Sequence, residues 1–103
     1  MRRKSKRDKR YSVIQPKLDR CYVCGAMGEG LHKHEVFEGT ANRAKSIKWG
    51  MVIALCPAHH NMSNDGIHFN KDLEKRVKRE AQIIFERTYP DEDFLRIFGK
   101  NYL

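Results

Sequence analysis

The chain has 103 residues and a mass of 12.1 kDa, the size of one small domain. It carries 21 Lys and Arg against 13 Asp and Glu, a formal net charge of +8. Seven cations and one acidic residue lie within residues 1–10, so this decapeptide has a net charge of +6 and the other residues share +2. No apolar run is long enough for a membrane span or a signal peptide. We expect a flexible basic tail over residues 1–12 and a single domain over residues 13–103.

The cysteines and histidines are concentrated in one stretch of the chain. All three cysteines and all five histidines lie between residues 21 and 68. Only 40% of the residues are hydrophobic and the mean hydropathy is −0.75. We therefore expect a small core that needs further stabilisation, such as a bound metal ion. An odd number of cysteines beside histidines favours metal binding in a reducing compartment over a disulfide framework. We therefore expect a cytoplasmic protein that is stabilised by metal.

The first two thirds of the chain predict short strands and a short helix. Glycines at the 28–30 turn predict a hairpin, followed by a strand over residues 31–37. Residues 38–50 are basic and end in glycine, which fits a loop or a turn of helix. The apolar run over residues 51–55 predicts a buried strand. A helix over residues 56–64 should follow, since its second residue is a proline.

The last third of the chain predicts two helices. From Asn70, a suitable N-cap, apolar residues recur at steps of four with Lys and Arg between them, until Pro90 stops the pattern. The apolar residues of this stripe are Leu73, Val77, Ala81, Ile84 and Phe85. Acidic residues then precede a short helix over residues 94–98 that should close at Gly99. The chain as a whole predicts an α+β fold with a C-terminal amphipathic helix and a short final helix.

Four residues have the spacing of ligands to one zinc ion. Two residues separate Cys21 from Cys24, and two separate Cys56 from His59. Two chelating pairs of this kind, one on a turn and one at a helix start, are typical of a closed tetrahedral Cys3His site in a treble-clef domain. Zinc bound there would contribute directly to folding. In the alternative interpretation, the cysteines are small buried apolar residues and His59 lies on the surface.

Four further histidines have no use in such a zinc site: His32, His34, His60 and His68. On a helix, His60 points about 100° away from the preceding residue, toward the strand that carries His34 and Glu35. His68 is close enough in the chain to return to the same place. Two or three imidazoles with a nearby carboxylate form an open divalent-metal site that leaves positions for water and phosphate. Alternatively, His32 is a surface residue and His68 a hydrogen-bonded core residue.

Together these motifs resemble the HNH endonucleases, which are ββα-metal, treble-clef nucleases, in the small form found in bacteriophages and prophages. The resemblance covers about residues 20–88 and rests on Cys21-x2-Cys24, His34-Glu35-Val36, Leu55-Cys56-x2-His59-His60 and Gly66-Ile67-His68-Phe69. It implies metal-dependent cleavage of DNA phosphodiester bonds, by nicking or double-strand cutting, in the cytoplasm of a bacterial host cell. It also implies structural Zn²⁺, with Mg²⁺, Mn²⁺, Ni²⁺ or Zn²⁺ at the catalytic centre.

The chain departs from the family pattern at three places. His59 stands where the fourth zinc ligand is usually cysteine, the family's orienting asparagine is absent, and Glu35 occupies the place of the general-base histidine. The resemblance leaves two assignments: His34 as ligand with Glu35 as base, or His34 as base with Glu35 and His60 as ligands. Strand alternation places His34 and Glu35 on opposite faces unless the strand is bulged, which favours His34 if only one is used. His68 joins the catalytic set in either case.

Affinity for DNA should come from cations that contact phosphates, because neither the metal nor the base reads sequence. Besides the tail, the candidates are Arg43, Lys45, Lys48, Lys71 and Lys75. We expect a monomer or weak dimer with little sequence preference, and phage packaging or recombination proteins as candidate partners. The main alternative is a non-catalytic treble-clef module that binds DNA or RNA. A third is a protein-binding adaptor in a phage assembly.

Overall fold

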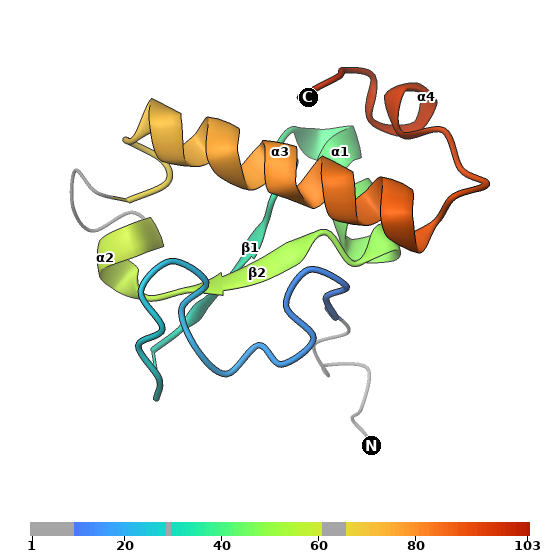
Figure 1. Ribbon diagram of the computed structural model, residues 1–103. Coiled ribbons are helices and arrows are strands. Elements are labelled where there is room, and N and C mark those ends of the chain that lie inside the picture. The colour runs from blue at the N-terminus through green and yellow to red at the C-terminus, as the bar shows by residue number, and fades with distance from the viewer. Residues whose placement is uncertain (1–9, 29, 61–65) are drawn as a thin grey trace.

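The computed structural model describes residues 10–28, 30–60 and 66–103. Its elements form an α+β fold built on one two-stranded sheet, as the sequence predicts. In chain order they are β1 (His32–Glu35), α1 (Thr40–Trp49), β2 (Val52–Leu55), α2 (Pro57–His60), α3 (Lys71–Thr88) and α4 (Phe94–Phe98) (Figure 1). Figure 1 shows α3 on one side of the strands and residues 10–28 on the other. None of the described helices is both long and apolar enough to cross a membrane.

The two strands pair antiparallel, and β2 is the buried one. His32 faces Leu55 and Glu35 faces Val52 across the pair. Every residue of β2 is buried, in keeping with its continuous apolar sequence. The N-terminal segment covers the other edge of β2, because Tyr22 N–H donates to the Ala54 carbonyl and Ala54 N–H donates to the Gln15 side chain, both at 2.8 Å. The paired strand and this segment leave little of the β2 backbone exposed.

Residues 38–50, for which the sequence predicts a loop or a turn of helix, contain the three-turn helix α1. Its only buried residue is Ser46, so it lacks the apolar stripe that predicts a helix. Ser46 links α1 to Phe37, two residues past β1, because its hydroxyl accepts from Phe37 N–H at 3.2 Å and donates to the Phe37 carbonyl at 3.1 Å. Gly50 ends the helix with φ of 74°, and a Cβ there would lie 2.7 Å from the Tyr11 ring.

The two C-terminal helices lie where the sequence predicts them, and four of the five predicted stripe residues of α3 are buried, whereas Ile84 is only half-buried. The Asn70 side chain accepts from Leu73 N–H at 3.1 Å at the start of α3. Asp93 caps α4 in the same way, and Gly99 ends it in the left-handed conformation. The buried stripe of α3 meets aromatic rings from α4 and from the residues that follow β1. The ring centroids of Phe37, Phe85, Phe94 and Phe98 are 4.6–5.8 Å apart in the contacting pairs. This cluster is the core that holds the helices over the sheet.

Residues 10–12, which we assigned to the tail, already contact the domain. Ser12 is buried, and its hydroxyl accepts from the N–H groups of Ile14 and Gln15. The Tyr11 hydroxyl donates to the Lys48 carbonyl. Of these three residues only Ser12 is buried, so the predicted tail meets the domain at its C-terminal end. The remainder of the predicted tail, the centre of the 28–30 turn and the end of the predicted 56–64 helix lie outside the described residues.

Candidate metal centres

Cys21, Cys24, Cys56 and His59 come together as the spacing predicts. Their ligand atoms all lie within 4.8 Å of one another. Cys24 Sγ lies 3.8 Å from Cys56 Sγ, and His59 Nδ1 lies 3.7 Å from Cys21 Sγ and 3.3 Å from Cys56 Sγ. Four ligands in a tetrahedron around zinc place two sulfurs about 3.8 Å apart and a sulfur and nitrogen about 3.5 Å apart. The set therefore fits a metal ion such as zinc.

Local backbone hydrogen bonds shape both halves of this cluster. Gly25 N–H donates to the Cys21 carbonyl and Cys21 N–H to the Ala26 carbonyl, both at 2.8 Å. Gly25 has φ of 78°, which glycine adopts at little cost. In the second half, His59 N–H donates to the Cys56 carbonyl at 3.0 Å, which turns α2 directly after β2. Short-range contacts thus form each chelating pair.

The electrostatics of Cys21 favour a thiolate. Burial acts to raise the pKa of its thiol, but hydrogen bonds from the backbone N–H groups of Cys56, Cys24 and Val23 outweigh this and lower the pKa to about 6. The thiolate is the form that binds metal. Cys21 is therefore a prepared ligand at neutral pH.

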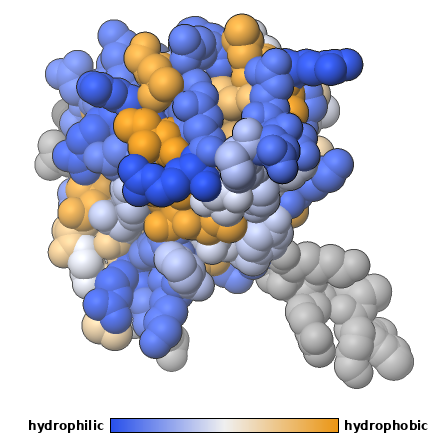
Figure 2. Space-filling model, turned by 45° about the vertical axis from the view of Figure 1, so that its right-hand side comes forward, coloured by the Kyte–Doolittle hydropathy of each residue, from blue (hydrophilic) through white to orange (hydrophobic). Residues whose placement is uncertain are grey.

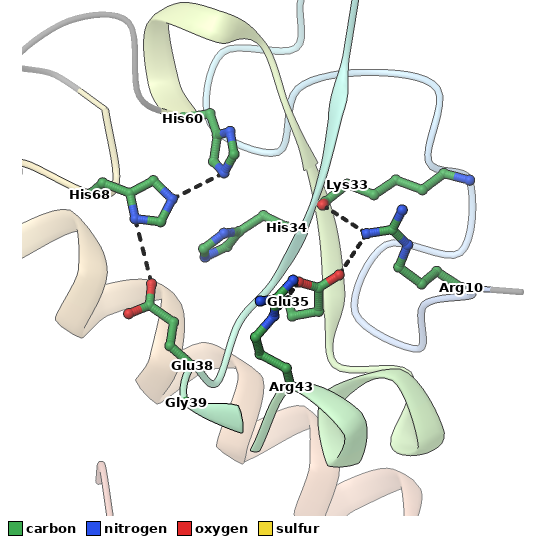
Figure 3. A pocket seen from close by; sticks show the side chains of 9 residues that line it. All are labelled: Arg10, Lys33, His34, Glu35, Glu38, Gly39, Arg43, His60 and His68. Atoms are coloured by element: carbon green, nitrogen blue, oxygen red, sulfur yellow. Dashed lines mark hydrogen bonds and ion pairs between the residues drawn. The ribbon is translucent and has the colours of Figure 1, made fainter. Parts of the chain in front are cut away.

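A second cluster unites three of the remaining histidines, His34, His60 and His68. Their ring nitrogens lie within 4.8 Å of one another, and Nε2 of His60 is 3.1 Å from Nε2 of His68. Two nitrogens bound to one metal ion are about 3.0–3.4 Å apart. Figure 3 shows the three rings converging from β1, α2 and the segment before α3. The group is close enough to hold a metal ion.

Backbone contacts bring His68 back to α2. Ile67 N–H donates to the His59 carbonyl at 2.8 Å, and His68 N–H donates to the His60 carbonyl at 3.3 Å. These bonds join α2, which carries the last ligand of the Cys3His cluster, to the segment just before α3. The position of His68 therefore depends on the same short helix that carries the last Cys3His ligand.

His32 and Glu38 support this second cluster, and the sequence interpretation did not assign them to it. Nδ1 of His32 lies 2.7 Å from Nδ1 of His60, and Oε2 of Glu38 lies 3.6 Å from Nδ1 of His68. Such contacts leave Nε2 of His60 and His68 for a metal and orient both rings. Strand alternation could have revealed His32, because it shares a strand face with His34. For Glu38, three residues past the end of β1, no sequence signal existed.

Two imidazoles of the cluster, those of His34 and His60, favour the neutral form that binds metals. Burial is the main cause that lowers the pKa of His34 to about 3, and the neighbouring His60, His68 and Lys78 lower it further. The pKa of His60 is also lowered, first by burial and then by His68 and His32. A neutral imidazole offers a lone pair without first losing a proton.

Glu35 lies outside this group of three, although it neighbours His34 in the strand. Its carboxylate pairs with Arg10 at 2.6 Å and with Arg43 at 3.5 Å. Figure 3 shows Glu35 directed toward these arginines, while the His34 ring faces the other histidines. The structure thus brings His34, but not Glu35, together with His60 and His68.

A pocket of about 470 Å³ opens beside the histidines. Three imidazoles, two carboxylates and three cationic side chains line it (Figure 3). The cations are Arg10, Lys33 and Arg43. The cluster therefore has an open side on which a phosphate would meet positive charge.

The five predicted DNA-binding cations do not share one site. Arg43 lines the histidine pocket. Lys45 donates to the Ile97 carbonyl at 2.7 Å, and Lys48 lies over the Trp49 ring; both face a different hollow that acidic residues also line. Lys71 and Lys75 line a third hollow, along α3. In the view of Figure 2, hydrophilic side chains cover much of the surface, with apolar patches between them.

Comparisons with protein-family models, with curated proteins and with solved structures gave no match.

Proposed function

We propose that the protein is a metal-dependent endonuclease of the HNH type, with a treble-clef ββα-metal fold, that hydrolyses DNA phosphodiester bonds with little sequence preference. The observation that carries the proposal is the pairing of two different clusters in one small domain. One is a closed set of three cysteines and a histidine, and the other is a set of three histidines at an open, positively charged pocket. A module that only binds nucleic acid has no use for the second set.

In this proposal the Cys3His cluster serves the fold. Zinc held by Cys21, Cys24, Cys56 and His59 would join the N-terminal turn to the β2–α2 junction. His60 directly follows His59 in α2. Closing the first cluster therefore aims His60 at the second.

The second cluster is the proposed catalytic centre. His34, His60 and His68 would hold a divalent cation, which supplies Lewis-acid stabilisation of charge on the phosphate and lowers the pKa of water. His32 and Glu38 keep the His60 and His68 rings in place. Arg43 lines the same pocket, where it would contact the phosphate backbone of DNA; such contacts carry no sequence information.

Cleavage of supercoiled plasmid tests the proposal directly. Purified protein is incubated with Mg²⁺, Mn²⁺, Ni²⁺ or Zn²⁺, or with chelator, and the nicked and linear products are quantified. Wild type should cut with at least one metal and not with chelator. His60→Ala should cut at least about a hundredfold more slowly, whereas Arg87→Ala, an exposed change at the end of α3, should cut like wild type.

Two results would count against the proposal. Protein that carries one zinc per chain and binds DNA, but cuts with none of these metals, is a non-catalytic nucleic-acid-binding module. Equal cutting by wild type and His60→Ala would show that the three histidines are not the catalytic centre.

A further inference from the structure

Glu35 is a buried carboxylate held between two arginines that come from distant parts of the chain. Arg10 belongs to the N-terminal segment, Glu35 ends β1, and Arg43 lies in the first turn of α1. Nη1 of Arg10 is 2.6 Å from Oε2, and Nε of Arg43 is 3.5 Å from Oε1. Each carboxylate oxygen therefore has its own guanidinium, and the three groups form one unit beside the histidine cluster (Figure 3).

Cationic side chains outnumber carboxylates among the described residues that line the pocket. Arg10, Lys33 and Arg43 are cationic, and Glu35 and Glu38 are the carboxylates. The other carboxylate of the pocket, Glu38, pairs with His68 instead. A cation in the histidine cluster would make the pocket more positive still. An anion that enters the pocket therefore meets more cationic than anionic side chains among the described residues.

Exposure shows which partners of the unit can reach a ligand. The Glu35 side chain is only 11% exposed, whereas Arg10 is 32% and Arg43 is 65% exposed. Both arginines line the pocket. A guanidinium has five N–H donors in a planar fork that matches phosphate geometry. The buried acid is thus the anchor, and the two guanidinium groups are the part that faces the solvent.

The same contacts make Glu35 a poor general base or metal ligand. Both roles need a carboxylate oxygen directed at water or at a cation, and each oxygen of Glu35 faces an arginine. Among the described residues, the metal-binding group in this pocket contains His34, His60 and His68 without Glu35. Of the roles open to Glu35, positioning the arginines is the one its contacts support.

We propose that Arg10 and Arg43, positioned by Glu35, form a phosphate-binding site beside the three histidines, and that its ligand is a backbone phosphodiester of a nucleic acid strand. The inference deepens the proposed function and rests on it for the identity of the reacting strand. The sequence before Arg10 favours a polyanion over free phosphate, because residues 1–9 carry six cations and one acidic residue. Charge of that density suits a polymer with many phosphates.

Binding measurements without added divalent metal test the site independently of cleavage. Fluorescence anisotropy of a labelled DNA duplex of about 20 base pairs gives the affinity of wild type, Arg10→Gln, Arg43→Gln and the control Arg87→Gln over a salt series. Each pocket variant should bind roughly tenfold more weakly. Each should also lower the slope of log affinity against log salt by about one. Losses no greater than that of Arg87→Gln would overturn the site.

Competition separates a backbone phosphate from a free one. Inorganic phosphate should displace the duplex from wild type no more effectively than sulfate at equal ionic strength. If inorganic phosphate displaces the duplex at a much lower concentration than sulfate does, the site binds free phosphate. That result would overturn the assignment to a nucleic acid strand.

The pH dependence of cleavage tests the role of Glu35. If Glu35 positions the arginines, Glu35→Gln should lower kcat/KM by about tenfold or more without changing the shape of its pH profile, and Glu35→Asp should recover part of the rate. Loss of the acidic limb of the profile in Glu35→Gln would identify Glu35 as the general base and overturn the positioning role. If no variant cuts DNA, the binding measurements still decide whether the phosphate site exists.

Discussion

The two metal clusters of this small domain differ in how the chain assembles them. The Cys3His cluster consists of two local pairs, each closed over two intervening residues, and three of its four donors are sulfur. The three-histidine cluster takes one residue each from β1, α2 and the segment before α3, and it borders a pocket. The first arrangement is closed and suits a structural ion, whereas the second leaves room for water and a substrate.

The difference also sets an order of dependence between the clusters. His59 and His60 are neighbours in α2, and the segment that carries His68 is hydrogen-bonded to the carbonyls of both. A change in the Cys3His cluster should therefore disturb the histidine cluster, while a change among the three histidines should leave the Cys3His cluster intact.

The largest effect is expected from breaking the closed cluster. Cys56→Ala removes a ligand that lies between β2 and α2, and structural zinc contributes about 10 kcal/mol or more in small zinc domains, as much as a typical domain's whole stability. The variant should be unfolded at 25 °C, as circular dichroism and zinc content would show. Retention of a cooperative melting transition near that of wild type would contradict a structural role for the cluster.

A smaller effect on the fold, but a large one on metal binding, is expected for the open cluster. His68→Ala should abolish binding of Ni²⁺ by the zinc-loaded protein in isothermal titration calorimetry, because it removes one nitrogen of the 3.1 Å pair. Its zinc content should remain one per chain. Loss of both metals together would show that the two clusters are not separable in the way that we propose.

The outer contacts should matter less than the ligands. His32→Ala and Glu38→Gln each leave all three ligands in place, and loss of such a partner typically costs about 10–100-fold in metal affinity. The same Ni²⁺ titration measures this, with exposed Lys17→Ala as the control. An affinity equal to that of the control would mean that the contacts to His60 and His68 do not orient the rings.

The smallest effect is expected from Tyr89, which is outside both clusters and so reports on the scaffold alone. Burial, aided by Tyr11, raises the pKa of Tyr89 to about 12. Because the folded pKa lies above the ordinary value near 10, this contribution to stability is complete below pH 10 and is lost as the pH rises toward 12. The melting temperature of Tyr89→Phe should fall less than that of wild type between pH 8 and pH 11, with zinc content unchanged. An equal fall in melting temperature for wild type and Tyr89→Phe over this pH range would contradict the raised pKa of Tyr89.

Local patterns in the sequence were sufficient to predict the Cys3His cluster and the C-terminal helices. Chelating pairs separated by two residues close through short-range hydrogen bonds, and the apolar stripe of α3 follows the period of a helix. The sequence predicted α1 only as a loop or a turn of helix, because Ser46 is its only buried residue. A hydrogen bond between Ser46 and Phe37, rather than an apolar face, joins α1 to the segment after β1.

The sequence by itself determined which residue types were available for two metal sites and for a basic surface. Only the tertiary structure decided which of them meet. It placed His34 with His60 and His68, gave Glu35 to Arg10 and Arg43, and tied Lys45 to α4. The physical reason is that adjacent residues of a strand point to different sides, and their partners come from segments whose positions depend on the packing of the whole chain.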